Sequence, residues 1–210
     1  MKNRFYLGNT SHPPLDTYQI PDILSPNNSV LVDIGSCRGD FMDAYRDKFQ
    51  ECFAFEASYE NASFINKRIV EENWENCVVF NLAVCGKSKE FIDLLSSDSG
   101  DAGSNSVLGG STHRNTKQRA YTIDFNDIFE FLNVDKIDLL KMDCEGCEYL
   151  SLFDARLENV KIICMELHHW ENFVDQKEKL KNHILKTHDI FSGGSSKGHE
   201  NITFILKESK

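Results

Sequence analysis

The stretch "VLVDIGSCRGDF", residues 30–41, is an apolar run that ends in a turn framed by Gly35 and Gly39. Glycines at such a turn let the backbone pass close to a ligand, and the N–H groups at the start of the following helix are available to bind it. The spacing Asp33-x-Gly35-x-x-x-Gly39 differs from the G-x-G-x-x-G fingerprint of dinucleotide-binding proteins, because position 37 is cysteine. The stretch therefore predicts a strand, a ligand-binding turn and a helix.

Similar apolar runs recur along the chain and alternate with amphipathic stretches. The runs cover residues 29–35, 52–57, 77–84, 136–143, 160–167 and 201–207, and the amphipathic stretches cover 41–49, 59–72, 148–157 and 171–188. Strands that alternate with helices are typical of βαβ units and a mostly parallel sheet. Nearly continuous apolar strands suit a sheet that is covered by helices on both faces. The fold class is therefore α/β.

The length and composition indicate one folded domain. The chain has 210 residues, of which 40% are hydrophobic and 27% are charged, values that are ordinary for a globular protein. We divide it into an N-terminal extension, 1–28, and a single domain, 29–210. The Ser-, Gly- and Asn-rich segment 96–117 interrupts the pattern, and is either a lid or substrate loop or a disordered excursion. The Gly/Ser-rich segment 192–201 is predicted to connect the last two strands.

Charge and hydropathy exclude several classes of partner. The net charge of −10 and the lack of a basic stripe argue against a nucleic acid as the main partner. No apolar run approaches the length of about 20 residues that a membrane span needs, and the N-terminus has no signal-like run. The seven cysteines, at positions 37, 52, 77, 85, 144, 147 and 164, lie mostly in apolar runs. We expect them to be reduced, which favours a cytoplasmic location.

Acidic residues at the ends of the first two strands indicate the ligand. Asp33 would repel a pyrophosphate, but it suits a ligand with an ammonium and a sulfonium group, which favours S-adenosylmethionine over NAD. Glu56, at the end of "FAFEAS", can accept hydrogen bonds from both ribose hydroxyls of an adenosine. Asn81 and Ala83 follow the next strand, where a cleft wall can face the adenine. The alternative is a tight turn with a surface glutamate.

The segment "KIDLLKMDCEGCEYLSLF", residues 136–153, delivers a cluster of acidic groups. Asp143 ends a strand, Glu145 lies on the turn, and Glu148 starts a helix, where the helix dipole favours a carboxylate. Ligands of open α/β sheets bind at the carboxyl ends of the strands. Crowded carboxylates raise one another's pKa unless a cation or proton separates them. Asp143 and Glu145 can therefore hold a metal, act as a general base, or bind the cofactor's ammonium.

Cys144 and Cys147 form a C-x-x-C pair in the same segment. A structural zinc site needs four ligands, and no second pair has a suitable spacing. A redox motif needs a thiol of low pKa, whereas Glu145 and Glu148 would raise it. We therefore interpret both cysteines as packing residues.

The strand "IICMELHHW" ends in Glu166 and His168. If it lies beside the strand that ends at Asp143, the three side chains converge. Several ionisable groups at neighbouring strand ends are typical of a catalytic site.

These blocks resemble, in order, those of the FkbM-type S-adenosylmethionine-dependent methyltransferases. The most specific is D-L-L-K-M-D-C-E-G-C-E, which is similar to that family's K-x-D-x-E-G-x-E signature. The similar blocks run from about residue 29 to 168. The resemblance implies a Rossmann-like class I methyltransferase fold, with a seven-stranded, mostly parallel sheet whose antiparallel last strand is 201–207. It also implies O-methylation, often of sugars.

The resemblance also implies roles for individual residues. The cofactor-binding set is Asp33, Gly35, Ser36, Gly39, Glu56, Ala57, Asn81, Ala83 and Asp143, with the first residues at the methionine part and Glu56 at the ribose. Lys141, Asp143, Glu145 and Glu148 match the late signature, and Glu166 and His168 match its partner strand. The chain departs from the family at Ser36-Cys37-Arg38, where small and apolar residues are usual.

We therefore predict an S-adenosylmethionine-dependent O-methyltransferase that acts on a hydroxyl of a sugar, glycan or glycosylated metabolite. Its catalytic residues are Asp143, Glu145 and His168, with His168 or Glu145 as general base. Asp143 and Glu166 offer oxygen ligands for Mg²⁺, and base-only and metal-assisted versions both stay open. The alternatives are a non-catalytic cofactor-binding or interaction protein of the same fold, a methyltransferase of another small-molecule class, and a nicotinamide oxidoreductase.

Overall fold

The structure of the chain is a computed structural model, which describes residues 18–21, 29–96, 106, 116–168, 174–195 and 198–208. The predicted lid or substrate loop, 96–117, lies mostly outside the described residues, as do His169 and most of the extension 1–28.

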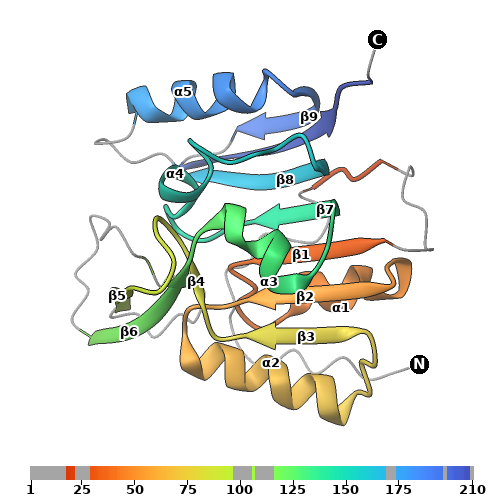
Figure 1. The fold of residues 1–210 in the computed structure, drawn as a ribbon, viewed down its shortest axis with the longest axis vertical. Helices are drawn as coiled ribbons and strands as arrows, with labels where there is room; N and C mark the ends of the chain where they lie inside the picture. Colours follow the sequence, from red (N-terminus) through yellow and green to blue (C-terminus); the bar gives the residue numbers. More distant parts are fainter. Residues whose placement is uncertain are drawn as a thin grey trace.

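A seven-stranded sheet forms the centre of the molecule (Figure 1). Its strands are β1 (Val30–Ile34), β2 (Glu51–Phe55), β3 (Cys77–Phe80), β7 (Ile137–Met142), β8 (Val160–His168), β9 (His188–Ser195) and β10 (His199–Leu206). They lie in the order β3-β2-β1-β7-β8-β10-β9, and β10 is antiparallel to both of its neighbours. The predicted mostly parallel sheet with an antiparallel last strand is confirmed, and β7 and β8 are neighbours as expected.

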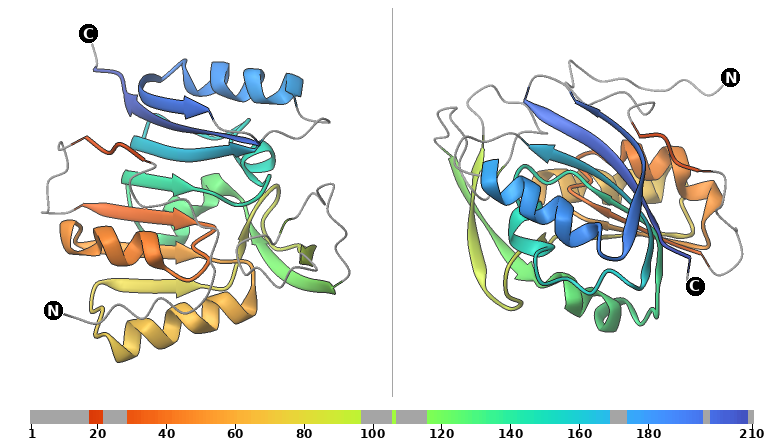
Figure 2. Two further views of the ribbon diagram at one scale, coloured as in Figure 1. Left: turned by 180° about the vertical axis from the view of Figure 1, so that it is seen from behind. Right: turned by 90° about the horizontal axis from the view of Figure 1, so that it is seen from above.

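Helices cover both faces of this sheet, as Figure 2 shows from above. The α-helices are α1 (Asp40–Tyr45), α2 (Tyr59–Glu71), α3 (Ile128–Leu132), α4 (Glu148–Ser151) and α5 (Val174–Ile184), with short 3₁₀ turns at Arg46–Lys48 and Phe125–Asp127. Buried residues of α1 and α2 pack on one face, and those of α3, α4 and α5 on the other, so each face has its own apolar core. None of the described helices combines the length and apolar character that crossing a membrane requires.

A second, smaller sheet was not expected from the sequence. It contains β4 (Ala83–Val84), β5 (Phe91–Ser96) and β6 (Thr116–Ile123), in the order β4-β6-β5. The run 77–84, predicted as one strand, is therefore divided between two sheets. The side-chain amide of Asn81 donates to the carbonyl oxygens of Glu56 and Ala57, at 2.9 and 3.0 Å, and so fixes the chain where it leaves the main sheet.

The C-terminal part also differs from the prediction. The helix expected at 171–188 is described only over Val174–Ile184, and His188 begins β9. Much of the connector predicted at 192–201 is strand, because Gly193 and Gly194 pair with β10 opposite Ile202 and Asn201. Ladder hydrogen bonds here outweigh the weak strand propensity of glycine.

One face of the sheet changes from apolar to polar within a single pleat. Leu31, Leu139, Ile162 and Ile205 lie in register across β1, β7, β8 and β10, and the next residues on the same face are Asp33, Lys141, Cys164 and Thr203. One step further, Glu166 lies opposite Asn201, and His168 opposite His199. Since side chains two apart along a strand share a face, the polar groups gather at the carboxyl ends of β7 and β8.

Candidate active site

A cleft opens at the carboxyl ends of β1, β2 and β7 and contains about 520 Å³ of free space, part of it open to solvent. It is lined by Ile34, Gly35, Cys37, Phe55, Glu56, Ala57, Leu82, Ala83, Val84, Leu94, Asp143, Cys144, Glu145 and Cys147. Of the predicted cofactor residues, Gly35, Glu56, Ala57, Ala83 and Asp143 are among them. Asp33, Ser36, Gly39 and Asn81 lie nearby but do not line the cleft, and Leu82 takes the wall position next to Asn81.

Gly35 is required where the turn after β1 meets the end of β7. Its φ is +73°, and a Cβ there would lie 1.9 Å from the carbonyl oxygen of Asp143. The N–H of Asp143 donates to the carbonyl of Ile34 at 3.0 Å, which holds the two strand ends together. Only glycine permits this close approach, so the glycine turn places Asp143 at the cleft.

Asp33 does not face the cleft but pairs with a lysine of the same chain. Its carboxylate is fully buried and lies 3.2 Å from Lys141 Nζ. The same ammonium donates to the carbonyl oxygen of Gly35 at 2.8 Å and lies 3.9 Å from Asp143. Burial raises the pKa of Asp33, and Lys141 opposes this rise. Two further predicted residues stabilise the same turn: Ser36 Oγ donates to the Asp33 carbonyl at 2.6 Å, and Gly39 is the N-cap of α1.

Glu56 is held in place by backbone donors. Its two carboxylate oxygens accept hydrogen bonds from the N–H groups of Cys37, at 2.7 Å, and Ser58, at 2.8 Å. Burial raises the pKa of Glu56 to about 7, although these hydrogen bonds lower it. The carboxylate is thus fixed at the cleft wall with unused lone pairs, the arrangement that a ribose needs.

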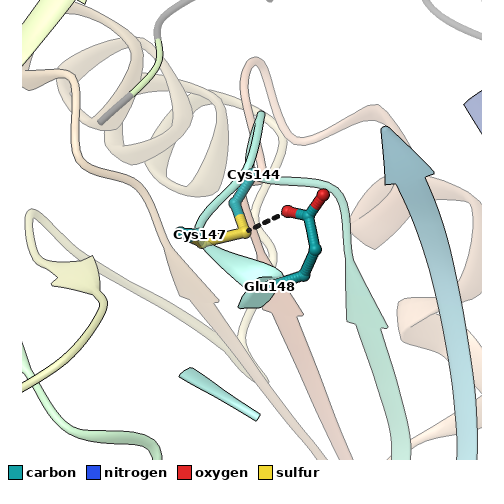
Figure 3. Close-up of side chains that lie close together, drawn as sticks. All are labelled: Cys144, Cys147 and Glu148. Atoms are coloured by element: carbon teal, nitrogen blue, oxygen red, sulfur yellow. Dashed lines mark hydrogen bonds between the residues drawn. A yellow bond between two sulfur atoms is a disulfide. The ribbon is translucent and has the colours of Figure 1, made fainter. Parts of the chain in front are cut away.

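Cys144 and Cys147 form a disulfide, with their Cα atoms 5.5 Å apart (Figure 3). The prediction that they are reduced packing residues is therefore wrong. That prediction considered how Glu145 and Glu148 affect the pKa of a thiol, which does not bear on a bridge between two sulfurs that the turn brings together. Both cysteines line the cleft, and the turn between them contains Glu145 with a left-handed φ of 54°.

His168 lies among three carboxylates. Its Nδ1 is 3.2 Å from Glu148 Oε1, and its Nε2 is 3.4 Å from Glu166 Oε1 and 3.6 Å from Glu145 Oε1. Burial alone would lower the pKa of His168, but hydrogen bonds and charges from Glu145 and Glu148 raise it to about 11. His168 is therefore a buried imidazolium at neutral pH. Glu148, fully buried at the start of α4, is its partner as well as a helix-start carboxylate.

Glu166 has one oxygen in the ion-pair network and one without a partner. Its Oε1 also lies 3.1 Å from His199 Nδ1, whereas its buried Oε2 accepts no hydrogen bond from the described residues. Burial and then the charge of Asp143 raise the pKa of Glu166 to about 7. Asp143, Glu166 and His168 each offer an atom that could ligate a metal, and these atoms lie within 4.8 Å of one another.

Sequence reasoning missed two further residues of this neighbourhood, Lys141 as the partner of Asp33 and His199 as a partner of Glu166. A lysine inside an apolar run was a usable signal for the first, because a buried ammonium requires an acidic partner. His199 carried no such signal, since only the pairing of β10 with β8 brings it to the site.

Residues 33–205 match the model of the Methyltransferase FkbM domain family. No curated protein matches the chain. Among solved structures, the FkbM methyltransferase from Methylobacillus flagellatus KT has 15% identity and a TM-score of 0.55, and the match covers 84% of this chain but only 43% of that one. An rRNA methylase from Streptococcus thermophilus has 7% identity and a TM-score of 0.53, with 88% and 90% covered. The fibrillarin/Nop5p complex has 12% identity and a TM-score of 0.52, with 86% and 73% covered.

At such low identities, the solved structures show the fold alone. The family match is of a different kind, because it extends over most of the chain and includes both the turn at Gly35 and the strand ends at Asp143 and Glu166. It agrees with the strand order of the main sheet and with the acidic cleft at the ends of β1, β2 and β7. The chain therefore belongs to the FkbM family of S-adenosylmethionine-dependent methyltransferases.

Proposed function

We propose that the protein transfers the methyl group of S-adenosylmethionine to a hydroxyl of a sugar, glycan or glycosylated metabolite. One observation supports this most directly: Asp143 belongs both to the cleft wall and to the group that it forms with Glu166 and His168. Asp143 thus joins the cofactor site to a set of ionisable groups that can act on an acceptor hydroxyl. In-line methyl transfer requires mainly that the two reactants be held in this way.

The cleft residues fit the cofactor. S-adenosylmethionine supplies an electrophilic methyl group on a sulfonium, and its cationic end suits a wall that contains Glu56, Asp143 and Glu145. Glu56 accepts hydrogen bonds from the ribose hydroxyls, and Leu82 and Ala83 provide an apolar wall for the adenine. Asp33 acts indirectly in this proposal, because it fixes Lys141 and through it the turn at Gly35.

A hydroxyl must lose its proton as the methyl group arrives, so a base is useful. The raised pKa of Glu166, about 7, is close to the optimum for a base at neutral pH. His168, with a pKa of about 11, already carries its proton and positions Glu145 and Glu166 instead. We therefore favour Glu166 as proton acceptor, ahead of Glu145 and His168.

A metal-assisted version has partial support. Asp143 and Glu166 offer carboxylate oxygens of the kind that Mg²⁺ prefers. The third nearby group, His168, carries a proton when no metal is bound, and a metal that bound it would have to displace that proton. Bound Mg²⁺ would lower the barrier by acting as a Lewis acid. Loss of transfer in EDTA and its recovery with Mg²⁺ would support this version, whereas full activity in chelator would exclude it.

The proposal also concerns the charge of the acceptor, the location of the protein and its division into domains. The net charge of −10 supports a neutral acceptor rather than a nucleic acid. The five cysteines that form no disulfide support a cytoplasmic location. The Cys144–Cys147 bridge is evidence against it, because disulfides are rare in a reducing compartment. We retain 1–28 as an extension and 29–210 as one domain.

A non-catalytic protein of this fold and a methyltransferase of another small-molecule class are the alternatives to the proposed function.

Mass spectrometry of a glycan pool incubated with the protein and deuteromethyl-labelled S-adenosylmethionine tests the proposal. We expect a labelled methyl group on a carbohydrate hydroxyl. Asp143→Asn should bind S-adenosylhomocysteine and lose transfer, while Asp154→Asn, an exposed aspartate after α4, should behave as the wild type. Label on a protein side chain instead would overturn the acceptor class, and undiminished transfer by Asp143→Asn would overturn the role of that residue.

A further inference from the structure

Tyr18 is a buried tyrosine whose hydroxyl has no hydrogen-bond partner among the described residues. Only 7% of the residue is exposed, and its ring packs edge-on against Phe41, with the ring centroids 6.0 Å apart. It belongs to the apolar core on the α1 side of the sheet, which includes Leu139 and Ile162. The hydroxyl oxygen is buried and makes no hydrogen bond with the described residues. Buried phenol hydroxyls normally form a hydrogen bond, so the Tyr18 hydroxyl is available to bind a ligand.

Tyr18 lies toward the acidic end of that sheet face, since the same core includes Cys164, which stands two residues before Glu166 on β8. Burial raises the pKa of Tyr18 well above its ordinary value, and the negative charges of Asp143 and Glu166 raise it further. The phenol therefore keeps its proton at any physiological pH. It is a hydrogen-bond donor beside carboxylates and cannot act as a base.

Two other buried atoms at this end of the sheet face lack a hydrogen bond to the described residues. Glu166 Oε2 and Asn201 Oδ1 are buried and accept no hydrogen bond from the described residues. Glu166 and Asn201 face each other directly across β8 and β10, so their side chains project from the same face of the sheet. Three distant parts of the chain thus bring one buried donor and two buried acceptors to this end of the sheet face. Leaving each one unpaired costs free energy, which a ligand would recover.

On the basis of the proposed function, we infer that Tyr18, Glu166 and Asn201 form the subsite that binds the acceptor, and that its ligand is a vicinal diol of a carbohydrate. A diol offers two O–H donors to Glu166 Oε2 and Asn201 Oδ1, and an oxygen that accepts from the Tyr18 hydroxyl. Glu166 is also the proton acceptor that we favour, so a hydroxyl bound to it is in position to lose its proton. Asp143, next to the same cluster, connects this subsite with the cofactor cleft.

Tyr18→Phe tests the inference, because it removes the hydroxyl and keeps the ring. No hydrogen bond with the described residues is lost, so the thermal midpoint should stay the same or rise, and the affinity for S-adenosylhomocysteine should not change. The KM for the acceptor found by mass spectrometry should rise at least tenfold. Tyr45→Phe is the control, since Tyr45 packs on the same Phe41 ring at 4.7 Å and its substitution should leave the acceptor KM and the cofactor affinity unchanged.

A binding measurement that does not depend on turnover separates this inference from the proposed function. In saturation-transfer NMR with S-adenosylhomocysteine present, methyl α-D-mannopyranoside should bind the wild type and bind Tyr18→Phe and Asn201→Ala much more weakly. Binding without turnover would leave the subsite in place and contradict the proposed reaction. An unchanged acceptor KM in Tyr18→Phe, a joint loss of thermal stability and cofactor affinity, or no binding of the diol to the wild type would overturn the subsite.

Discussion

The ammonium of Lys141 lies 3.2 Å from the carboxylate of Asp33, and both side chains are buried between β1 and β7. Lys141→Met leaves the Asp33 charge buried without its partner, and we expect it to lower the free energy of unfolding by about 3–5 kcal/mol. Urea denaturation measures this. Lys67→Met, which removes an exposed i,i+4 pair with Glu71, should cost about 0.5 kcal/mol or less. Similar losses in both variants would contradict the structural importance of the buried pair.

Gly35→Ala should be much more damaging than Gly86→Ala. Both glycines have positive φ, so each substitution incurs left-handed strain of about 1–2 kcal/mol. At Gly86 the added methyl group meets open space, whereas at Gly35 it meets the backbone of Asp143. We therefore expect Gly35→Ala to lower the thermal midpoint further and to weaken cofactor binding as well. Equal shifts of the two midpoints would show that β1 and β7 do not approach so closely.

Cofactor affinity should rise with pH through the pKa of Glu56. The ionised carboxylate has more lone pairs to offer the ribose hydroxyls, and burial places the pKa of Glu56 at about 7. Calorimetric titration with S-adenosylhomocysteine should therefore give tighter binding at pH 8 than at pH 6. Glu56→Gln should bind more weakly and lose this dependence. If the pH dependence persists in Glu56→Gln, another group is responsible for it.

The stabilisation that His168 contributes should decline as the pH rises. Its folded-state pKa, about 11, lies above the unfolded value of about 6.5, so the folded state binds the proton more tightly. The contribution is complete below pH 6.5 and is lost as the pH rises toward 11. The difference in free energy of unfolding between the wild type and His168→Gln should therefore be smaller at pH 10 than at pH 6.

His188 provides a control of opposite sign. Burial lowers the pKa of His188, so its contribution is present above pH about 6.5 and declines as the pH falls. The stability lost in His188→Gln should thus be greater at pH 8 than at pH 5. Matching pH profiles for His168→Gln and His188→Gln would contradict the assignment of His168 as an imidazolium.

Reduction of the Cys144–Cys147 bridge should loosen the turn that carries Glu145. Loop-closure entropy for so short a loop suggests a loss of about 2 kcal/mol in the free energy of unfolding. The thermal midpoint and the affinity for S-adenosylhomocysteine should both fall when dithiothreitol is added. The double variant Cys144→Ser/Cys147→Ser should show the lower values and no response to the reductant. Alkylation of both thiols in protein that was never reduced would show that the bridge does not form.

The sequence predicts the centre of the main sheet well because β1, β2, β7 and β8 are largely buried on both faces and are therefore nearly continuously apolar. It does not predict β6, since "TKQRAYTI" is largely polar and becomes a strand through its pairing with β5. The resemblance identifies Glu56 and Asp143, both of which line the cleft.

The contacts that the sequence does not predict join residues far apart along the chain. Lys141 and Asp33 are in register only because β7 inserts beside β1, more than a hundred positions away along the chain. Tyr18 precedes the first recognised motif and reaches the site only through its packing in the core, and thiol chemistry does not predict the disulfide of Cys144 and Cys147, which depends on the geometry of the turn.

The position of β10 between β8 and β9 also determines when the site can form during synthesis. Asn201 and His199 reach Glu166 and His168 only after α5, β9 and β10 have left the ribosome, because these elements follow β8 in the sequence. A nascent chain that ends before β10 leaves the acidic edge of β8 unpaired and its charges without these neighbours. Formation of the hairpin between β9 and β10 is therefore the step that adds Asn201 and His199 to this cluster.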